Sequence, residues 1–589
     1  MEKLRARPEL WVALAAVAVR LLYLATARSP SFAEPLIDAD YYDYLGVRLS
    51  QGEGFPDPVF WQPPLYSLML AGLYSVFGHA LLWPRLLQCA LGAIMAALSC
   101  NLAERATGER RAGVAAGLLV ALHGPLIFYE GELLPTVLAT FLGLLALWLA
   151  LAEAPSVSRA AMSGAAIGLG ALAVAPTLLL VVPVGGWLLR TRRALGLCCV
   201  AACVLCVLPA TLANRIRGGE WLPISSNGGV NLWIGNNADA DRAIAIRPGA
   251  GWEALVEEPA RKGLRTRGQQ DAYFVRKAVG WCTSQPWACL KNLGWKARLL
   301  LASRELPRNE DLAVIRKDSP VLSVLAPQLG GAALPYALLL PLAAAGAVRA
   351  FRERNRLLLR VLAAAGALAA APVLFFVTGR YRIPLAPLVC ILAAVGLVEL
   401  LSRQQRRWPA GLAAAALLAV AVWPVRLAVD DIDFEAEMHY VIGGRRARLG
   451  NQQGAVEAWG LALAKRPDYL EAGFNRALAL EGLGKPREAA TTYEAVLQHH
   501  PDHLVARVRH GFALLEAREL PGAHAAFTAL ANNTRTAPVG LLGLARVALA
   551  RGELDAATTL LNQAEQRGGQ SQTSAEVRRG IEAARRPAP

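Results

Sequence analysis

Long apolar runs dominate the chain up to about residue 430, and amphipathic helical patterns replace them after that point. Most of these runs approach the ~20 residues that cross ~30 Å of hydrocarbon. The pattern therefore predicts an all-α protein, with a polytopic bundle of about eleven transmembrane helices in residues 1–430 and a second helical domain in residues 435–589. The eleven apolar runs are 10–27, 81–103, 113–128, 134–152, 161–174, 177–189, 194–213, 332–349, 357–377, 383–401 and 408–428.

Two of the runs, 161–174 and 177–189, are short and flank the tripeptide Ala175-Pro176-Thr177. We expect a bent or re-entrant pair of helices joined at this break, because a break is tolerated where other helices cover the free backbone groups. The stretch from Pro63 to Phe77 is also apolar, short and preceded by prolines. It fits a partly embedded interfacial helix better than a membrane-spanning helix.

Basic residues fix the predicted orientation. With eleven spans, all the basic clusters fall on one side of the membrane, and the positive-inside rule makes that side cytoplasmic. The external side then holds a first loop (28–80), a large loop (214–330) and everything after residue 430. The protein is thus expected in the membrane, as in a bacterial inner membrane, with its N-terminus inside. The clusters are Lys3/Arg5/Arg7, Arg105/Arg110/Arg111, Arg190/Arg192/Arg193, Arg349/Arg352/Arg354/Arg356 and Arg403/Arg406/Arg407.

Composition supports this organisation. The hydrophobic fraction is 55% and the charged fraction 18%, whereas a soluble globular protein carries roughly 25% charged residues. A wholly soluble, disordered or fibrous chain is therefore excluded. The net charge of +16 is explained mainly by the cytoplasmic loops, so we expect no nucleic-acid partner.

Nine cysteines in a chain of this length form no disulfide framework. Only Cys282 and Cys289 lie in an external soluble loop, and Pro286 between them indicates a turn that joins two helices. Such a turn can bring their α-carbons within bonding range, and disulfides persist outside the cytoplasm. We therefore predict a bond between these two residues.

The C-terminal domain repeats with a period of 34 residues. Small residues recur where paired helices would approach, and large apolar residues recur where a gap between helices needs filling. This order resembles the tetratricopeptide repeat and predicts an α-solenoid of about four repeats over 436–567, with a capping helix at 574–585. Its concave surface suits a protein partner, although a stabilising platform without a dedicated partner is the alternative. The recurring positions are Gly443/Ala477/Gly511/Ala545, Ala455/Ala489/Ala523/Ala557, Trp459/Tyr493/Phe527/Leu561 and Pro467/Pro501.

The first external loop carries the most unusual chemistry, since Asp38, Asp40 and Asp43 lie within six residues just past a predicted span. One interpretation is a helix start, where aspartate caps free amide groups. The other is a catalytic site. The sequence contains no glycine loop typical of nucleotide binding, no His/Cys metal-ligand spacing and no serine nucleophile motif.

Several motifs together resemble the C superfamily of membrane-embedded glycosyltransferases, in the family 39-like branch of protein O-mannosyltransferases and aminoarabinose transferases. The resemblance covers about residues 10–400, and a tetratricopeptide tail also resembles bacterial members of this branch. Two departures stand out: Ala175 replaces a basic residue that many relatives have, and Pro135-Thr136 replaces a second acid. The matching motifs are Asp38 with Tyr42, Gln62–Tyr66, Phe128–Glu132, Ser226–Asn231 with Ile234–Asn237, Glu305–Asn309 and Gly379–Pro384.

The resemblance implies a polyprenyl-phosphate sugar as donor and an inverting transfer outside the membrane. Inversion needs a base that takes the proton of the acceptor hydroxyl, and we expect Asp38 in this role. Asp40 or Glu132 could orient the acceptor or hold a divalent metal ion, although no cofactor is required by the motifs. We expect Asp38, Glu132 and Arg380 to line one cavity that is open to lipid and to the external side.

A leaving phosphate needs cations beside it, and arginine binds phosphate bidentately. Arg380 and Arg382 are the candidates, with contact to lipid headgroups as the alternative. Arg20, in the outer half of the first span, could reach the phosphate as well, because an ionisable residue at that depth often has a function; contact with headgroups is again the alternative. The remaining candidate substrate contacts are Tyr42, Gln62, Asn231 and Asn236, where the asparagines could equally form turns.

Two other functions fit the same topology. One is a lipid-linked glycan polymerase or ligase, and the other is a non-catalytic membrane scaffold that assembles envelope machinery through the repeats. If the protein is a transferase, its acceptor is a protein or a glycan, and the repeats hold that acceptor or a partner enzyme near the site. Every candidate catalytic residue precedes residue 430, so truncation near Glu435 should leave a folded membrane module.

Overall fold

A computed structural model describes residues 7–330, 332–402, 408–568 and 572–586 of the protein. The chain divides into two units, Met1–Ile432 and Asp433–Pro589. Helices form nearly all of the regular structure, and the strands in the described residues are β1 (Gln328–Leu329) and β2 (Ala332–Ala333), which pair antiparallel. The basic residues Lys3, Arg5, Arg403, Arg406 and Arg407, which entered the predicted orientation, lie outside the described residues.

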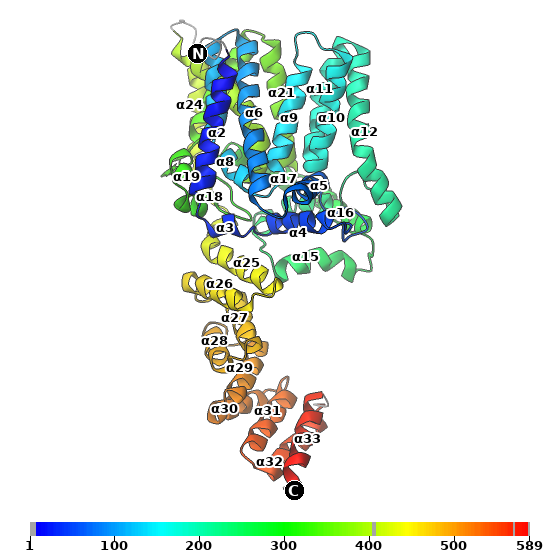
Figure 1. Ribbon diagram of the computed structural model, residues 1–589, viewed down its shortest axis with the longest axis vertical. Helices are drawn as coiled ribbons and strands as arrows, with labels where there is room; N and C mark the ends of the chain where they lie inside the picture. Colours follow the sequence, from blue (N-terminus) through cyan, green and yellow to red (C-terminus); the bar gives the residue numbers. More distant parts are fainter. Residues whose placement is uncertain (1–6, 331, 403–407, 569–571, 587–589) are drawn as a thin grey trace. The chain divides into compact units, whose positions relative to one another are not determined.

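Each of the eleven apolar runs coincides largely with one helix of the first unit. Figure 1 shows α2, α6, α9, α10, α11 and α12 with roughly parallel axes, and α21 and α24 among them. The helices of the eleven runs are α2 (Pro8–Thr26), α6 (Leu82–Thr107), α7 (Arg110–Ala121), α9 (Thr136–Ala150), α10 (Val157–Ala173), α11 (Val181–Thr191), α12 (Arg193–Gly218), α20 (Tyr336–Arg352), α21 (Arg356–Leu374), α23 (Ala386–Leu401) and α24 (Trp408–Val422).

The first unit is a multi-pass membrane domain. Within the described residues, five helical stretches are long and apolar enough to cross a membrane, and a bent helix pair makes a sixth. Helices α9, α10, α24 and the stretch Ala175–Thr191 are apolar but shorter. The all-α architecture of the bundle is therefore confirmed, whereas eleven crossings remain a prediction.

Short helices gather at one end of the bundle, where α3, α4 and α15 lie across the direction of the long helices (Figure 1). We call this end of the first unit the site end. The expected interfacial helix forms as α5 and packs on α4. The other helical elements of the first unit are α3 (Pro30–Ala33), α4 (Asp38–Ser50), α5 (Leu65–Phe77), α8 (Gly124–Gly131), η1 (Ala175–Leu180), α13 (Gly228–Gly235), α14 (Ala240–Ile244), α15 (Ala250–Arg261), α16 (Arg267–Ser284), α17 (Pro286–Leu300), α18 (Leu312–Ile315), η2 (Arg316–Asp318), α19 (Pro320–Leu325), α22 (Gly379–Arg382), η3 (Ile383–Leu385) and η4 (Ala428–Asp431).

The bundle contains two breaks, of which the sequence indicated one. The expected break after α10 is the 3-10 segment η1, which contains Pro176. The second break separates α7 from α8 by a bend of 46°, where a single run was expected. Pro125 lacks a backbone N–H and so favours a helix start at this point. His123 caps the new helix, because its Nδ1 accepts a hydrogen bond from the Leu126 amide at 3.1 Å.

Small residues let the long helices approach closely. On α10, a Cβ added at Gly164 would lie 1.9 Å from the Cys199 carbonyl oxygen of α12, and one at Gly168 would lie 2.6 Å from that of Cys203. Any larger side chain would force these two helices apart. This packing through small residues is typical of membrane helices, which gain no hydrophobic driving force from one another in lipid.

The second unit is a series of helix pairs followed by one last helix. The second helices of the pairs begin at Gln452, Pro486, Leu520 and Leu554, each 34 residues after the one before. This is the period that the sequence predicts. The helices are α25 (Phe434–Arg448), α26 (Gln452–Lys465), α27 (Leu470–Gly482), α28 (Pro486–His499), α29 (Leu504–Glu516), α30 (Leu520–Ala531), α31 (Ala537–Ala550), α32 (Leu554–Gln566) and α33 (Gln572–Arg585).

The repeating positions form the core of this solenoid. All four repeating alanines are fully buried, and so are the large apolar residues that follow them. At Gly443, an added Cβ would lie 2.5 Å from the Trp459 ring, and at Gly511 it would lie 2.8 Å from the Phe527 ring. Small and large residues are therefore complementary within each pair. The expected capping helix is α33, which packs Val577 and Ile581 onto the last pair.

Candidate active site

Asp38 and Arg380 form an ion pair at the site end, although 342 residues separate them in the chain. The Arg380 Nη1 atom donates to the Asp38 Oδ2 atom at 2.6 Å, and both side chains are partly accessible. The Arg380 Nε atom also donates to the Thr136 hydroxyl oxygen at 3.2 Å. Thr136, one of the residues at which the sequence departs from the family that it resembles, therefore contacts the ion pair.

Asp38 is the first residue of α4, but it does not cap the helix. The N-cap position is Ile37, whose φ of 49° is left-handed and whose side chain makes no cap hydrogen bond. A bulky residue with positive φ is strained, and surrounding structure must hold it in place. Asp38 and Asp40 both lie in the first turn of the helix, as the helix-start interpretation expects. Asp38 also pairs with Arg380, and its catalytic role stays a prediction.

A fixed turn holds Arg380. The Gly379 amide donates to the Leu306 carbonyl at 2.8 Å, and an added Cβ at Gly379 would lie 2.1 Å from the Glu305 Oε2 atom. Only glycine fits this close approach. The Thr378 hydroxyl caps the short helix α22 by accepting from the Tyr381 amide. Two of the sequence motifs, Glu305–Asn309 and Gly379–Pro384, therefore meet at this turn.

The segment that contains Glu132 is held by side chains of α6. The Gln88 Nε2 atom donates to the main-chain carbonyls of both Glu130 and Glu132 at 2.8 Å, and the Arg85 Nε atom donates to the Gly131 carbonyl at 2.8 Å. The Tyr66 hydroxyl in turn donates to the Gln88 side chain at 3.0 Å. The buried Tyr42 ring packs edge-to-face on Tyr66 with 5.2 Å between centroids, which connects α4 to the Glu132 segment.

Two further carboxyl groups lie near the ion pair. Burial raises the pKa of Glu310 well above its usual value; the charges of Glu132 and Asp38 add to this effect, while Arg380 opposes it. Burial also raises the pKa of Glu132, against the neighbouring Arg85. The Glu310 Oε1 atom is buried, and among the described residues it has no hydrogen-bond partner. The site thus combines one ionised pair with carboxyl groups that hold their protons more firmly.

Arg308 is a second cation near the ion pair. Burial lowers its pKa, and among the charges acting on it are those of Asp38 and Arg380. Its guanidinium lies over the Phe376 ring at 4.5 Å, and its Nη1 atom donates weakly to the Ile244 carbonyl at 3.5 Å. No carboxylate within the described part of the chain forms an ion pair with it. Arg308 therefore has donors available for an anion.

Arg382 and Arg20 are placed differently from what the sequence suggested. Arg382 is buried, donates to the carbonyls of Ala302 and Arg304 at 2.5 and 2.7 Å, and stacks on the Tyr336 ring at 4.2 Å. Its Nη2 atom also lies 3.4 Å from the Glu305 carboxylate. Arg20 is fully buried and pairs with both carboxylate oxygens of Glu130, at 2.6 and 2.9 Å. Both guanidinium groups are thus engaged by buried groups of the protein.

The side chains of Asp40, Asp43 and Gln62 differ in their burial and in their hydrogen bonds. Asp40 lies half-buried in the first turn of α4. Asp43 is buried and accepts hydrogen bonds from Tyr74 and His79, so it stabilises the fold. The Gln62 Oε1 atom is buried, and no described residue donates to it.

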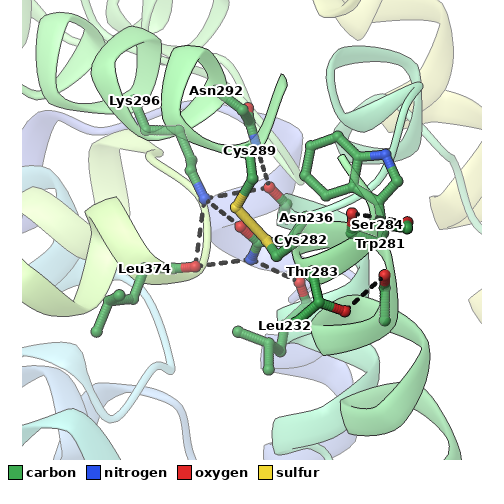
Figure 2. The surroundings of a disulfide bond; sticks show 12 residues. Leu232, Asn236, Trp281, Cys282, Thr283, Ser284, Cys289, Asn292, Lys296 and Leu374 are labelled. Atoms are coloured by element: carbon green, nitrogen blue, oxygen red, sulfur yellow. Dashed lines mark hydrogen bonds between the residues drawn. A yellow bond between two sulfur atoms is a disulfide. The ribbon is translucent and has the colours of Figure 1, made fainter. Parts of the chain in front are cut away.

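The two asparagines are engaged within the fold. Asn231 donates to the Asn227 carbonyl within its own helix. Asn236 donates to the carbonyls of Leu232 and Leu374 and accepts from the Lys296 ammonium at 2.9 Å. Lys296 also donates to the carbonyls of Gly235, Leu374 and Phe375, as Figure 2 shows in part. These contacts tie α13 and α17 to the end of α21, five residues before Gly379.

The same region contains a disulfide. Cys282 and Cys289 are bonded, with their α-carbons 5.1 Å apart, across the turn between α16 and α17 (Figure 2). No group of three or more His, Cys, Asp or Glu residues suited to a metal ion occurs in the part of the chain that the structure describes.

Sequence reasoning missed several residues of the site. In the sequence, Thr136 attracted attention only as a departure from the family that the chain resembles. Glu310 directly follows the Glu305–Asn309 motif. Arg308 lies inside that motif, where its charge could have marked it as a phosphate ligand. Glu130 lies inside the Phe128–Glu132 motif, but nothing in the sequence shows that it pairs with Arg20. Such pairs depend on contacts across the fold.

Comparison with models of protein families finds no match, and neither does comparison with curated proteins. Among solved structures, ArnT from Cupriavidus metallidurans bound to undecaprenyl phosphate is 16% identical, with a TM-score of 0.36 over 83% of this chain and 80% of that chain. The apo state of the same protein is 17% identical, with a TM-score of 0.37 and the same coverage. The APC/C hetero-tetramer Cut9-Hcn1 is 12% identical, with a TM-score of 0.23 over 95% and 98% of the two chains.

Proposed function

We propose that the protein transfers a sugar from a polyprenyl-phosphate donor to an acceptor hydroxyl on the extracytoplasmic side, with inversion at the anomeric carbon. The observation that carries this proposal is the Asp38–Arg380 ion pair at 2.6 Å, which places a carboxylate base beside a phosphate-binding cation. The pair lies at the end of an apolar helix bundle, where a lipid-anchored donor can reach it.

The chemistry follows from these two groups. Asp38 takes the proton of the acceptor hydroxyl, the hydroxyl oxygen attacks the anomeric carbon, and the bond from that carbon to the phosphate oxygen breaks. A positioned base contributes about 10²–10⁴-fold to such a step. Arg380 and Arg308 hold the departing phosphate, since guanidinium groups bind phosphate oxygens bidentately.

The donor also activates the base in this proposal. In the ion pair, the Arg380 guanidinium occupies the Asp38 Oδ2 atom. A phosphate that draws Arg380 toward itself frees this oxygen for the acceptor proton. Glu132 and Glu310, whose carboxyl groups tend to stay protonated, are suited to hydrogen-bond sugar or acceptor oxygens.

The test is Asp38→Asn in a deletion strain that expresses the variant, with mass spectrometry of its glycans and glycoproteins. We expect the modification to disappear, while the purified variant keeps its thermal stability and still binds undecaprenyl phosphate. Asp57→Asn is the matched control, because Asp57 pairs with Arg267 elsewhere in the same unit at 3.3 Å. Full restoration of the modification by Asp38→Asn would favour the scaffold function, and a loss of long glycan chains alone would favour the polymerase.

We further propose that the site and the repeat unit both face the extracytoplasmic side of a bacterial inner membrane. Support comes from the distribution of basic residues along the sequence. A tag at Pro589 should be cleaved by protease added to intact spheroplasts. Protection of that tag, with cleavage only after lysis, would overturn this orientation.

The repeats are proposed to bind a protein acceptor or a partner enzyme. Tethering raises the local acceptor concentration to about the millimolar range but supplies no catalytic group. Truncation near Glu435 should therefore leave undecaprenyl phosphate binding intact and weaken transfer to the native acceptor, mainly through apparent affinity. An unchanged apparent affinity for that acceptor would contradict the tethering role.

A further inference from the structure

Helix α17 (Pro286–Leu300) exposes an unusual face. Its buried side carries Cys289, Lys296 and Leu299. On its other side, Trp287 is 73% exposed and Leu290 is 55% exposed. With Lys291 and Trp295, these residues form one stripe along the helix, because residues three and four apart share a face. We call this stripe the α17 face; large apolar side chains gathered in this way mark an interaction surface.

Hydrogen bonds fix the position of α17 relative to the apolar bundle. The Lys296 Nζ atom donates at 3.2 Å to the carbonyl of Leu374, which ends α21. The Arg298 Nη2 atom donates at 2.7 Å to the carbonyl of Trp423, which directly follows α24. Helix α17 is therefore held at the ends of two apolar helices, where those helices would leave the hydrocarbon.

The two helices that hold α17 expose large apolar side chains as well. Leu374 and Trp423 are themselves exposed, and so are Leu412 and Leu418 along α24. An apolar surface of this kind on a membrane domain faces lipid. Tryptophan, lysine and arginine are the residues that gather at the boundary between lipid and water.

The face is also held rigidly. The Cys282–Cys289 bond closes the turn from which α17 begins, and the Asn292 side chain donates to the Gly235 carbonyl at 2.8 Å. Figure 2 shows these contacts on the buried side of the helix. Trp287 therefore projects from a fixed helix and not from a loose loop.

We infer that the α17 face lies in the headgroup region of the bilayer leaflet at the site end, with Lys291 beside lipid phosphates. Aromatic and aliphatic side chains enter the acyl boundary, while the lysine remains at the level of the headgroups. The partner is thus a lipid surface. This inference does not depend on the sugar transfer, and it makes α17 a second contact between the site end and the membrane, next to the one predicted for α5.

The test places a spin label at Leu290→Cys in protein reconstituted in nanodiscs of phosphatidylethanolamine and phosphatidylglycerol. Collision with oxygen, which enters lipid, is compared with collision with a water-soluble nickel chelate. Leu205→Cys, exposed on the α12 span, calibrates lipid, and Glu257→Cys, exposed on α15, calibrates water. The unsubstituted protein, labelled in parallel, gives the background from its own cysteines.

We expect the label at position 290 to show an oxygen-to-nickel ratio between the two calibrants and clearly above that of position 257. Brominated lipids should also quench less of the total tryptophan fluorescence in a Trp287→Phe variant than in the unsubstituted protein. A ratio equal to that at position 257 would place the face in water and overturn the inference. A label shielded from both reagents would overturn it as well, since a second copy of the chain or another protein would then cover the face.

Discussion

The two units bury their polar groups in different ways. In the membrane unit, fully buried charges pair over long stretches of chain, as Arg20 and Glu130 do across 110 residues. In the repeat unit, ion pairs such as Arg487–Glu519 span 32 residues and stay accessible to solvent, and the buried Glu437 accepts a hydrogen bond from Tyr469, also 32 residues away. The first unit therefore depends on a few specific long-range pairs, whereas the second depends on many equivalent local contacts.

The largest effect should come from breaking a buried pair in the membrane unit. Arg20→Met leaves the Glu130 carboxylate without its partner in a fully buried place, which typically costs about 3–5 kcal/mol. Purified protein should show a clear fall in its thermal unfolding temperature. The double variant Arg20→Met with Glu130→Leu should recover much of the loss, because no unpaired charge remains. Equal instability of the single and double variants would mean that packing, and not charge, matters at this place.

The variant Phe527→Ala should cause a comparable loss of stability, limited to the repeat unit. The Phe527 side chain is fully buried, and its removal should cost about 3–5 kcal/mol of the stability of that unit. Limited proteolysis should then release the repeats while the membrane unit keeps its resistance. Leu461→Ala, an exposed position of the same unit, serves as the control. Equal loss of resistance in both units would show that they unfold together.

The variant Lys296→Met removes the buried ammonium group that donates to several main-chain carbonyls, and its loss of stability should be intermediate. Loss of its charged hydrogen bonds should destabilise the protein by about 1.5–3 kcal/mol and lower transfer, because these bonds hold the chain just before Gly379. Lys296→Arg should restore part of both.

The burial of Lys296 also predicts that the stability of the protein depends on pH. Burial lowers the pKa of Lys296 to about 8, so the native state loses this proton while the unfolded chain still holds it. Above pH 8, up to the ordinary lysine range, the unfolded state binds more protons, and stability should rise with pH. The unfolding temperature of the wild type, measured relative to that of Lys296→Met, should therefore increase as the pH rises through this window. Parallel curves would exclude the titration of Lys296.

The smallest effect is expected from Arg487→Ala, which removes an exposed ion pair of the repeat unit. Such pairs contribute roughly 0–1 kcal/mol, and added salt should reduce even this difference. Chemical denaturation of the protein with and without salt measures it. A loss as large as that of Phe527→Ala would contradict the distinction drawn between the two units.

The difference between the two units also explains which features of each could be predicted from the sequence. The repeat unit was predicted in register, because Ala455, Trp459 and their equivalents report local packing that recurs every 34 residues. In the membrane unit, hydropathy located the helices of the eleven apolar runs but not α16 and α17, and the motifs included Asp38 and Arg380. Their pairing, the role of Thr136 and the engagement of Arg382 with main-chain carbonyls depend on contacts between distant segments, for which a single sequence holds no periodic pattern.

The break at His123 shows the same limit on a smaller scale. The run 113–128 is uniformly apolar, so hydropathy alone predicts one helix. The bend arises because Pro125 and a capping histidine end one helix and begin another, a local effect that the apolar pattern conceals.

The constant spacing of the second helices in the repeat unit has one more consequence. Since Gln452, Pro486, Leu520 and Leu554 begin equivalent helices, removing or duplicating one complete period joins surfaces of the same shape. The reach of the solenoid can therefore change in whole steps during evolution or engineering, while its cross-section stays the same.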